Sequence, residues 1–374
     1  MIRRVYIRGY KSLVDFELKP ERMTLLLGPN GSGKSAVLEC LASLREFIVS
    51  GKNIRDSFPW DVFPLVGLDE VSIQEMNLEV IVNDDLYNYY LMFDVDLFGL
   101  CEESLTINND MVFKSKEREL YIYKRNNQQE VVISLSALPE RSSVQMLMHD
   151  GRVAPFRSFI DSLLIIHHQP QLMTGSIRGR DLHLQTNGSN FASWWHHLLV
   201  TDAELVMAVA AVLQEVIPGF RCMQLKVIGE NVFSLMVVFA LGNNKSSEIP
   251  FTQLSDGQKS LILLYTVLVY MKFGRAHFLF MDEPENFLAL PEIMPWLNQL
   301  MSQSEENASG GQYMIISHHP NLINFLARDW GKWIDRDANS GVSKIHNISE
   351  VLSDTEEGLP LSVLVERGWI LDHG

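Results

Sequence analysis

The stretch Met23-Thr-Leu-Leu-Leu-Gly28-Pro-Asn-Gly-Ser-Gly33-Lys34-Ser35 decides the fold of this 374-residue chain. An apolar segment runs into the pattern G-x-x-x-x-G-K-[ST], and a helical pattern follows. Glycines allow backbone N–H groups to surround a phosphate, the helix N-terminus adds positive potential, and the lysine neutralises phosphate charge. The serine hydroxyl is suited to bind Mg²⁺. The predicted phosphate-binding residues are Asn30, Gly31, Ser32, Gly33, Lys34 and Ser35.

A second motif, His277-Phe-Leu-Phe-Met-Asp282-Glu283-Pro284, ends an apolar segment with two carboxylates. The carboxyl ends of parallel strands lie at one edge of a sheet, so both carboxylates are expected beside the phosphate-binding loop. We predict that Asp282 belongs to the Mg²⁺ shell and that Glu283 polarises the attacking water as a general base. A strand that merely ends in a polar turn is the alternative, and the accompanying phosphate-binding loop disfavours it.

A third motif, Leu254-Ser255-Asp256-Gly257-Gln258, precedes an almost wholly apolar helical segment. Ser255 and Gln258 have the spacing of a capping box, which would stabilise the start of a buried helix for structural reasons alone. A serine hydroxyl and glycine N–H at a helix N-terminus can also grip a γ-phosphate from outside. The two interpretations are compatible.

In chain order, the phosphate-binding loop, Leu254–Gln258, the segment that ends in Asp282-Glu283 and then Ser317-His318 resemble the motifs of the ABC-type ATPases of the SMC/RecF/OLD group. The resemblance covers residues 1–50 and about 160–345. Leu184-Gln-Thr-Asn-Gly-Ser-Asn-Phe-Ala-Ser-Trp194 and Ile316-Ser-His-His-Pro320 are more narrowly similar to compact AAA-family ATPases of bacterial anti-phage defence operons, of the Septu, PARIS and retron kind. The implied fold is α/β: a P-loop NTPase with an ABC/SMC-head-like core, an inserted β-rich lobe and a helical signature subdomain.

The resemblance also implies roles for individual residues. Ser255, Gly257 and Gln258 would form the ABC signature of one subunit and contact ATP held by Lys34 of another, so that two ATP molecules with Mg²⁺ lie in a head-to-tail homodimer. Glu283 would be the catalytic glutamate.

His318 would be the switch histidine that contacts the γ-phosphate. A glutamine linking Mg²⁺ to lobe motion is expected at Gln169 or Gln171, and Gln169 is our predicted metal ligand. One departure is visible: residues 285–291 lack the family's usual histidine before Pro291.

Along the chain, strand and helix patterns predict four segments. Residues 1–50 form the first half of the ATPase core, and residues 51–155 form the β-rich lobe, with alternating strands from about 76 to 135. Residues 156–256 form a region that is helical to about 217 and then β. Residues 257–374 form the second half of the core, where helices and strands alternate as in a parallel sheet.

Composition limits the class of protein. The chain is 47% hydrophobic and 21% charged, typical of a folded protein, and its net charge of −15 argues against a protein that coats nucleic acid. Local basic patches are candidates at the start of the chain, among them Arg4 and Arg8. The three cysteines have no C-x-x-C spacing, and the longest apolar run is too short to cross a bilayer. We therefore predict a soluble cytoplasmic protein that does not act at a membrane.

The leading functional hypothesis is an ATP-driven clamp that dimerises, with higher oligomers possible, and controls a separately encoded nuclease or toxin in anti-phage defence. One alternative is a RecF-like DNA repair clamp, which would bind DNA directly. Another is a scaffold in which ATP is structural and its turnover incidental. A transporter subunit is disfavoured because of the inserted β-rich lobe.

Overall fold

The computed structural model describes residues 1–58, 73–96, 99–124, 129–134, 140–241, 245–306, 311–351 and 360–366. The chain divides into two compact units. Unit 1 comprises Met1–Leu163 and Gln312–Gly374, and unit 2 comprises Leu164–Gly311. No helix within the described ranges is long and apolar enough to cross a membrane.

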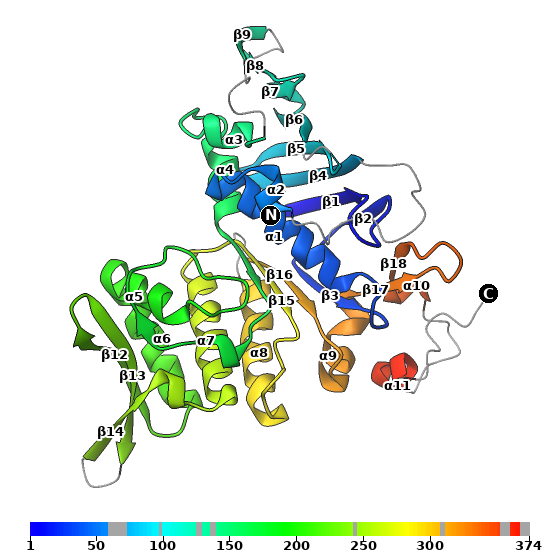
Figure 1. Ribbon diagram of the computed structural model, residues 1–374. Coiled ribbons are helices and arrows are strands. Elements are labelled where there is room, and N and C mark those ends of the chain that lie inside the picture. Colours follow the sequence, from blue (N-terminus) through cyan, green and yellow to red (C-terminus); the bar gives the residue numbers. More distant parts are fainter. Residues whose placement is uncertain are drawn as a thin grey trace. The chain divides into compact units, whose positions relative to one another are not determined.

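An antiparallel sheet of eight strands, in the order β2-β1-β4-β5-β6-β7-β8-β9, belongs to unit 1 (Figure 1). Alternate residues of β4 and β5 are buried, so one face of the sheet is covered. Phe156 of α4 (Ala154–Asp161) stacks on Tyr87 and Tyr89 of β5. The strands are β1 (Ile2–Arg8), β2 (Phe16–Leu18), β4 (Ile73–Val82), β5 (Asp85–Asp94), β6 (Gly99–Ile107), β7 (Asp110–Lys116), β8 (Glu119–Tyr123) and β9 (Gln129–Ser134).

The predicted antiparallel strands between about 76 and 135 are therefore confirmed. Pairing of β1 with β4 places the first strand of the chain in this same sheet. The region before β4 contains the short helix α2 (Ile54–Ser57), and residues 59–72 lie outside the described ranges.

Unit 1 also contains parallel strands that position the phosphate-binding loop. Strand β3 (Met23–Leu27) pairs in parallel with β16 (Gln312–Ile316) and β17 (Gly331–Arg336), and β17 pairs antiparallel with β18 (Ser343–Asn347). Every residue of β3 and β16 is buried. The helices of this part are α1 (Lys34–Ser50), α3 (Ser143–Met146), α9 (Pro320–Trp330), α10 (Ile348–Val351) and α11 (Leu361–Glu366).

Helices dominate unit 2. Trp194 and Trp195 of α5 are each 1% exposed, and the Trp194 ring meets Tyr270 of α7 edge to face with ring centroids 5.2 Å apart, so both tryptophans belong to the core. The helices are α5 (Phe191–Thr201), α6 (Ala203–Val216), α7 (Asp256–Lys272) and α8 (Leu290–Glu306), with 3₁₀ turns η3 (Pro170–Leu172) and η4 (Phe251–Gln253).

The strands of unit 2 fall into two groups. A small sheet contains β11 (Ser176–Ile177), β12 (Phe220–Gly229), β13 (Val232–Leu241) and β14 (Lys245–Pro250), while β10 (Leu163–Ile166) neighbours β15 (Phe278–Asp282). Strands β10 and β11 correct the expectation that residues 156–217 are helical. A four-residue apolar run such as β10 has no periodicity that separates a buried strand from a buried helix.

Candidate functional site

The phosphate loop, residues 28–35, is shaped by glycines. Gly28, Gly31 and Gly33 have φ values of 145°, 78° and 107°. A Cβ on Gly28 would lie 1.9 Å from the carbonyl oxygen of Ile334, and one on Gly33 would lie 2.6 Å from Oγ of Ser343. Only glycine satisfies both the backbone conformation and the space at these two positions.

The end of the phosphate loop, where α1 begins, suits a phosphate. Helix α1 begins at Lys34 without a side-chain cap, an arrangement that suits an anion at the helix N-terminus. Lys34 is buried, and its Nζ donates to the carbonyl oxygens of Gly28 and Pro29, both at 2.8 Å. The buried hydroxyl of Ser32 has no hydrogen-bond partner among the described residues. These features suit the residues to hold the phosphates of a nucleotide.

The loop is supported by two serines outside the motif. The Ser343 hydroxyl donates to the carbonyl oxygen of Ser32 at 2.6 Å and accepts from the Ser12 hydroxyl at 2.8 Å. The Ser343 backbone N–H donates to the Ser12 carbonyl oxygen at 2.9 Å. No local sequence pattern indicates this role, because the two serines are distant in sequence from the loop and from each other.

His318 lies at the same sheet edge as the phosphate loop. The parallel pairing of β16 with β3 sets Ile316 opposite Leu26, so both strands end together. The His318 side chain is exposed. His319 instead caps α9, where its Nδ1 accepts from the Asn321 N–H at 3.2 Å. Of the two histidines, His318 is therefore the one placed to meet a ligand, and its γ-phosphate contact stays a prediction.

The two carboxylates predicted for catalysis differ in environment. Asp282 ends β15 and its side chain is 6% exposed, with Oδ2 3.2 Å from Nδ1 of His167. Glu283 follows with a left-handed φ of 48°, and its Oε2 accepts from Nδ2 of Asn286 at 2.6 Å. A non-glycine residue in this conformation is strained, and such strain concentrates at functional turns.

His167 was not among the site residues predicted from the sequence. A signal did exist, since His167 is the first polar residue after the apolar strand β10, just as Asp282 ends the apolar strand β15. Recognising the signal required recognising β10 as a strand.

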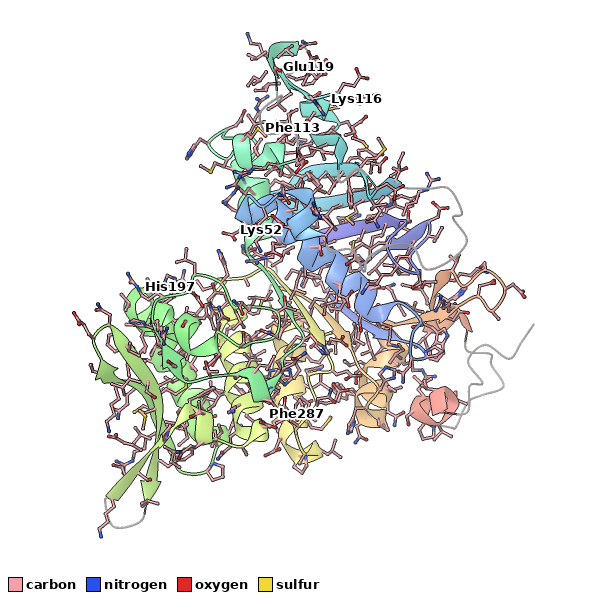
Figure 2. The ribbon with its side chains drawn as sticks, in the orientation of Figure 1. Lys52, Phe113, Lys116, Glu119, His197 and Phe287 are labelled. Atoms are coloured by element: carbon pink, nitrogen blue, oxygen red, sulfur yellow. The ribbon has the colours of Figure 1, made fainter. Side chains whose placement is uncertain are left out.

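The signature turn, residues 254–258, forms the predicted capping box at the start of α7. Ser255 Oγ accepts from the Gln258 N–H at 3.2 Å, and Gln258 Oε1 accepts from the Ser255 N–H at 3.1 Å. A Cβ on Gly257 would lie 2.9 Å from the carbonyl oxygen of Phe287. Phe287, labelled in Figure 2, belongs to the turn after Glu283 and is 47% exposed. The structural role of the turn is confirmed, and its contact with ATP stays a prediction.

The histidine segment, residues 167–171, connects Asp282 to the start of α7. Nε2 of His168 lies 3.1 Å from the Ser260 hydroxyl. Nζ of Lys259 donates to the Pro170 carbonyl oxygen at 3.2 Å, and Nε2 of Gln171 donates to Asp256 at 3.0 Å. Burial, together with the charge of the neighbouring His167, lowers the pKa of His168 to about 4, so His168 is neutral at pH 7.

The two glutamines of this segment are placed differently. Gln171 bonds to the signature turn through Asp256, whereas the Gln169 side chain is exposed. Its backbone N–H donates to the carbonyl oxygen of Asn187 at 3.0 Å. Metal ligation by Gln169 stays a prediction.

Comparison with known proteins identifies the family. The sequence profile described as "AAA domain, putative AbiEii toxin, Type IV TA system" matches residues 23–324. The chain belongs to this AAA family. Comparison with curated proteins gives no match.

Solved structures of SMC heads share the fold of this AAA-family chain. An SMC head bound to the C-terminal winged-helix domain of ScpA has a TM-score of 0.55 and 14% identity, over 92% of this chain and 96% of that one. The SMC head domain from Thermotoga maritima has a TM-score of 0.50 and 13% identity, over 92% and 98%. An SMC head with an extended coiled coil, bound to the C-terminal domain of ScpA from Pyrococcus furiosus, has a TM-score of 0.50 and 12% identity, over 92% and 95%. The chain thus combines membership of this AAA family with a fold similar to that of SMC heads.

Proposed function

We propose that this protein is an ATP-hydrolysing clamp whose ATP-dependent, head-to-tail homodimerisation controls a separate nuclease or toxin in anti-phage defence. The observation that carries the proposal is the set of contacts in unit 2 that joins Asp282, through the histidine segment, to the signature turn. The family description, which names a toxin of a toxin–antitoxin system, supports a defence setting.

In this proposal Lys34 and the N–H groups at the start of α1 hold the phosphates of ATP. Ser35, Asp282 and Gln169 hold Mg²⁺, which when bound neutralises charge developing on the phosphates. Glu283 accepts the proton of the attacking water, and His318 contacts the γ-phosphate. Buried Asp282 is oriented by His167, whose Nδ1 lies 3.2 Å from Oδ2 of the carboxylate.

In this proposal the contacts in unit 2 couple the two ATP sites of the dimer. Asp282 would serve ATP held by its own subunit, whereas the signature turn would serve ATP held by the second subunit. A shift of Asp282 on loss of the γ-phosphate would move His167, and the bonds from His168 and Gln171 to α7 would carry that shift to the signature turn. Only such state-dependent contacts allow ATP to change a dimer equilibrium.

Direct DNA binding is less well supported. Two of the basic residues proposed as a patch are engaged with carboxylates: Arg4 lies 2.7 Å from Glu17, and Arg8 lies 3.1 Å from Glu75. These pairings reduce the charge available to phosphates, since a DNA clamp relies on Lys and Arg to displace counterions.

The decisive experiment mixes two inactive variants. Lys34→Ala removes the phosphate lysine, and Ser255→Arg obstructs the signature turn. A mixture can form one intact site per heterodimer, so we expect recovery of about a quarter of wild-type turnover if the subunits exchange at random. Ser255→Thr, which retains a capping hydroxyl, is the matched control and should stay active. A mixture no more active than its separate components contradicts shared sites.

The effector is tested by capture from the native host. Glu283→Gln protein loaded with ATP should retain the effector, because the closed state persists without hydrolysis. Lys34→Ala protein should not retain it. Equal capture by the two variants would favour a scaffold in which ATP turnover is incidental.

A further inference from the structure

The eight-stranded sheet of unit 1 has two edge strands with different chemistry. Strand β2 has three residues, and its Glu17 lies 2.7 Å from Arg4 and 2.8 Å from Lys19. Strand β9 lies at the far end of the sheet (Figure 1). Its residues Val131, Val132 and Ile133 are 43%, 45% and 43% exposed. A charged, short edge resists pairing with other strands, whereas an apolar edge invites it.

Both faces of β9 are apolar. Successive side chains of a strand point to opposite faces, so Val131 and Ile133 occupy one face and Val132 the other. The ladder between β8 and β9 is regular from Val131 to Ser134, and its irregularity lies at the start of the strand, near Gln129. Residues 129–134 contain no lysine, arginine or proline, the residue types that commonly protect an edge.

We propose that β9 pairs antiparallel with β9 of a second copy of this chain, in a contact that does not depend on ATP. An antiparallel pair of identical strands is self-complementary and suits a two-fold dimer. Strands present backbone groups of alternate residues at an edge, so the two-fold axis must pass through a residue opposite its own twin.

The side chains of β9 favour a pair whose two-fold axis passes through Val132. This arrangement places Val131 of each copy opposite Ile133 of the other, and Val132 opposite its own twin. Every exposed apolar residue of β9 therefore meets an apolar partner. Centring on Val131 would instead set Val132 and Ile133 against the irregular start of the strand, and centring on Ile133 would place Ser134 opposite Val132.

The contact is small, because β9 has six residues. Stable interfaces bury at least about 1,200 Å², so association through β9 alone is expected to be weak and dependent on protein concentration. The proposed ATP-dependent dimer uses other residues. A second contact at β9 would link such dimers, and two weak contacts on one molecule reinforce each other through effective concentration.

The experiment is disulfide trapping without nucleotide, in full-length protein carrying Cys101→Ser and Cys222→Ser; the remaining Cys40 is buried. Val132→Cys places each new thiol opposite its twin, within reach of a disulfide. Ser134→Cys is the matched control on the same strand, because its twin would lie four residues along, about 13 Å away. We expect at least fivefold more disulfide-linked dimer from Val132→Cys, with the same yield after adding Lys34→Ala.

Equal yields from the two cysteine variants overturn the proposal, as does a yield that requires ATP. A second measurement uses Val132→Lys, which adds a charge at a half-exposed position. In sedimentation without ATP at high concentration, the wild type should show a rising average mass that Val132→Lys lacks, with unchanged thermal unfolding. If Val132→Lys instead loses only capture of the effector and the cysteines do not link, the edge binds that partner and not a second copy.

Discussion

Helices α1 and α7 begin in opposite ways, although a nucleotide-binding role is proposed for both N-termini. Helix α1 starts after a glycine with no side-chain cap, and Lys34 folds back onto loop carbonyl oxygens. Helix α7 starts with a complete capping box between Ser255 and Gln258. The N-terminus of α1 has no side-chain cap, whereas the N-terminus of α7 is already capped. Phosphate can therefore bind α1 without displacing a cap, but at α7 it must compete with or add to existing bonds.

The largest expected effect is on ATP binding at the N-terminus of α1. Lys34→Ala removes the only buried amine of the phosphate loop, and we expect ATP affinity to fall at least about 100-fold. Titration with a fluorescent ATP analogue measures this, with thermal unfolding as the check on folding. Unchanged affinity would show that the loop does not bind the triphosphate.

A loss confined to turnover is expected from Glu283→Gln. The amide can still accept from Asn286 but cannot take a proton, so hydrolysis should fall by about 100-fold or more while ATP binding persists. Single-turnover hydrolysis and analogue titration separate the two. Parallel losses of binding and turnover would instead assign Glu283 to binding.

The fold near the phosphate loop was predictable because its signals are local. Glycine spacing, an apolar strand before the loop and an apolar helix after it lie within residues 23–50, and the structure has β3 and α1 there. Capping of α7 was predictable for the same reason, since Ser255 and Gln258 are three residues apart. Local backbone chemistry determines both features.

The contacts that support the site were not predictable. Ser12 and Ser343 meet beneath the phosphate loop although 331 residues separate them in sequence. The His167–Asp282 contact depends on β10, whose four apolar residues do not distinguish a strand from a helix. Tertiary pairing of strands creates these contacts, and one sequence alone does not reveal such pairing.

The capped N-terminus of α7 should respond to substitution in stability rather than in binding. Ser255→Ala leaves the Gln258 N–H without its side-chain acceptor, and we expect a loss of about 1 kcal/mol in the free energy of unfolding. Chemical denaturation without nucleotide measures it, and Ser255→Thr is the control that should lose less. If Ser255→Ala changes ATP-dependent dimerisation but not stability, the hydroxyl serves the nucleotide and the cap is redundant.

At a third helix N-terminus, that of α3, a buried carboxylate of the protein itself accepts a hydrogen bond from the backbone. Oε2 of Glu103 accepts from the Ser143 N–H at 2.6 Å, and Oε1 accepts from the hydroxyls of Ser142 at 2.6 Å and Tyr89 at 2.8 Å. Burial nevertheless raises the pKa of Glu103 above its usual value of 4.5, because desolvation outweighs these bonds. The carboxylate therefore binds its proton more tightly in the folded protein than in the unfolded chain.

The sign of the pH effect follows from this difference. Between the unfolded pKa and the raised folded pKa the native state holds more protons, so the contribution of Glu103 to stability is complete below pH 4.5 and is lost as pH rises through the folded pKa. Glu103→Gln cannot ionise, yet its oxygen can accept from Ser143 and its NH₂ can donate to the two hydroxyls. The free energy of unfolding, measured by denaturant titration from pH 4.5 to 8, should fall more with pH in the wild type than in the variant. Identical pH slopes would mean that folding leaves the pKa of Glu103 unchanged, and that the bonds to Ser142, Ser143 and Tyr89 offset the cost of desolvation in this buried setting.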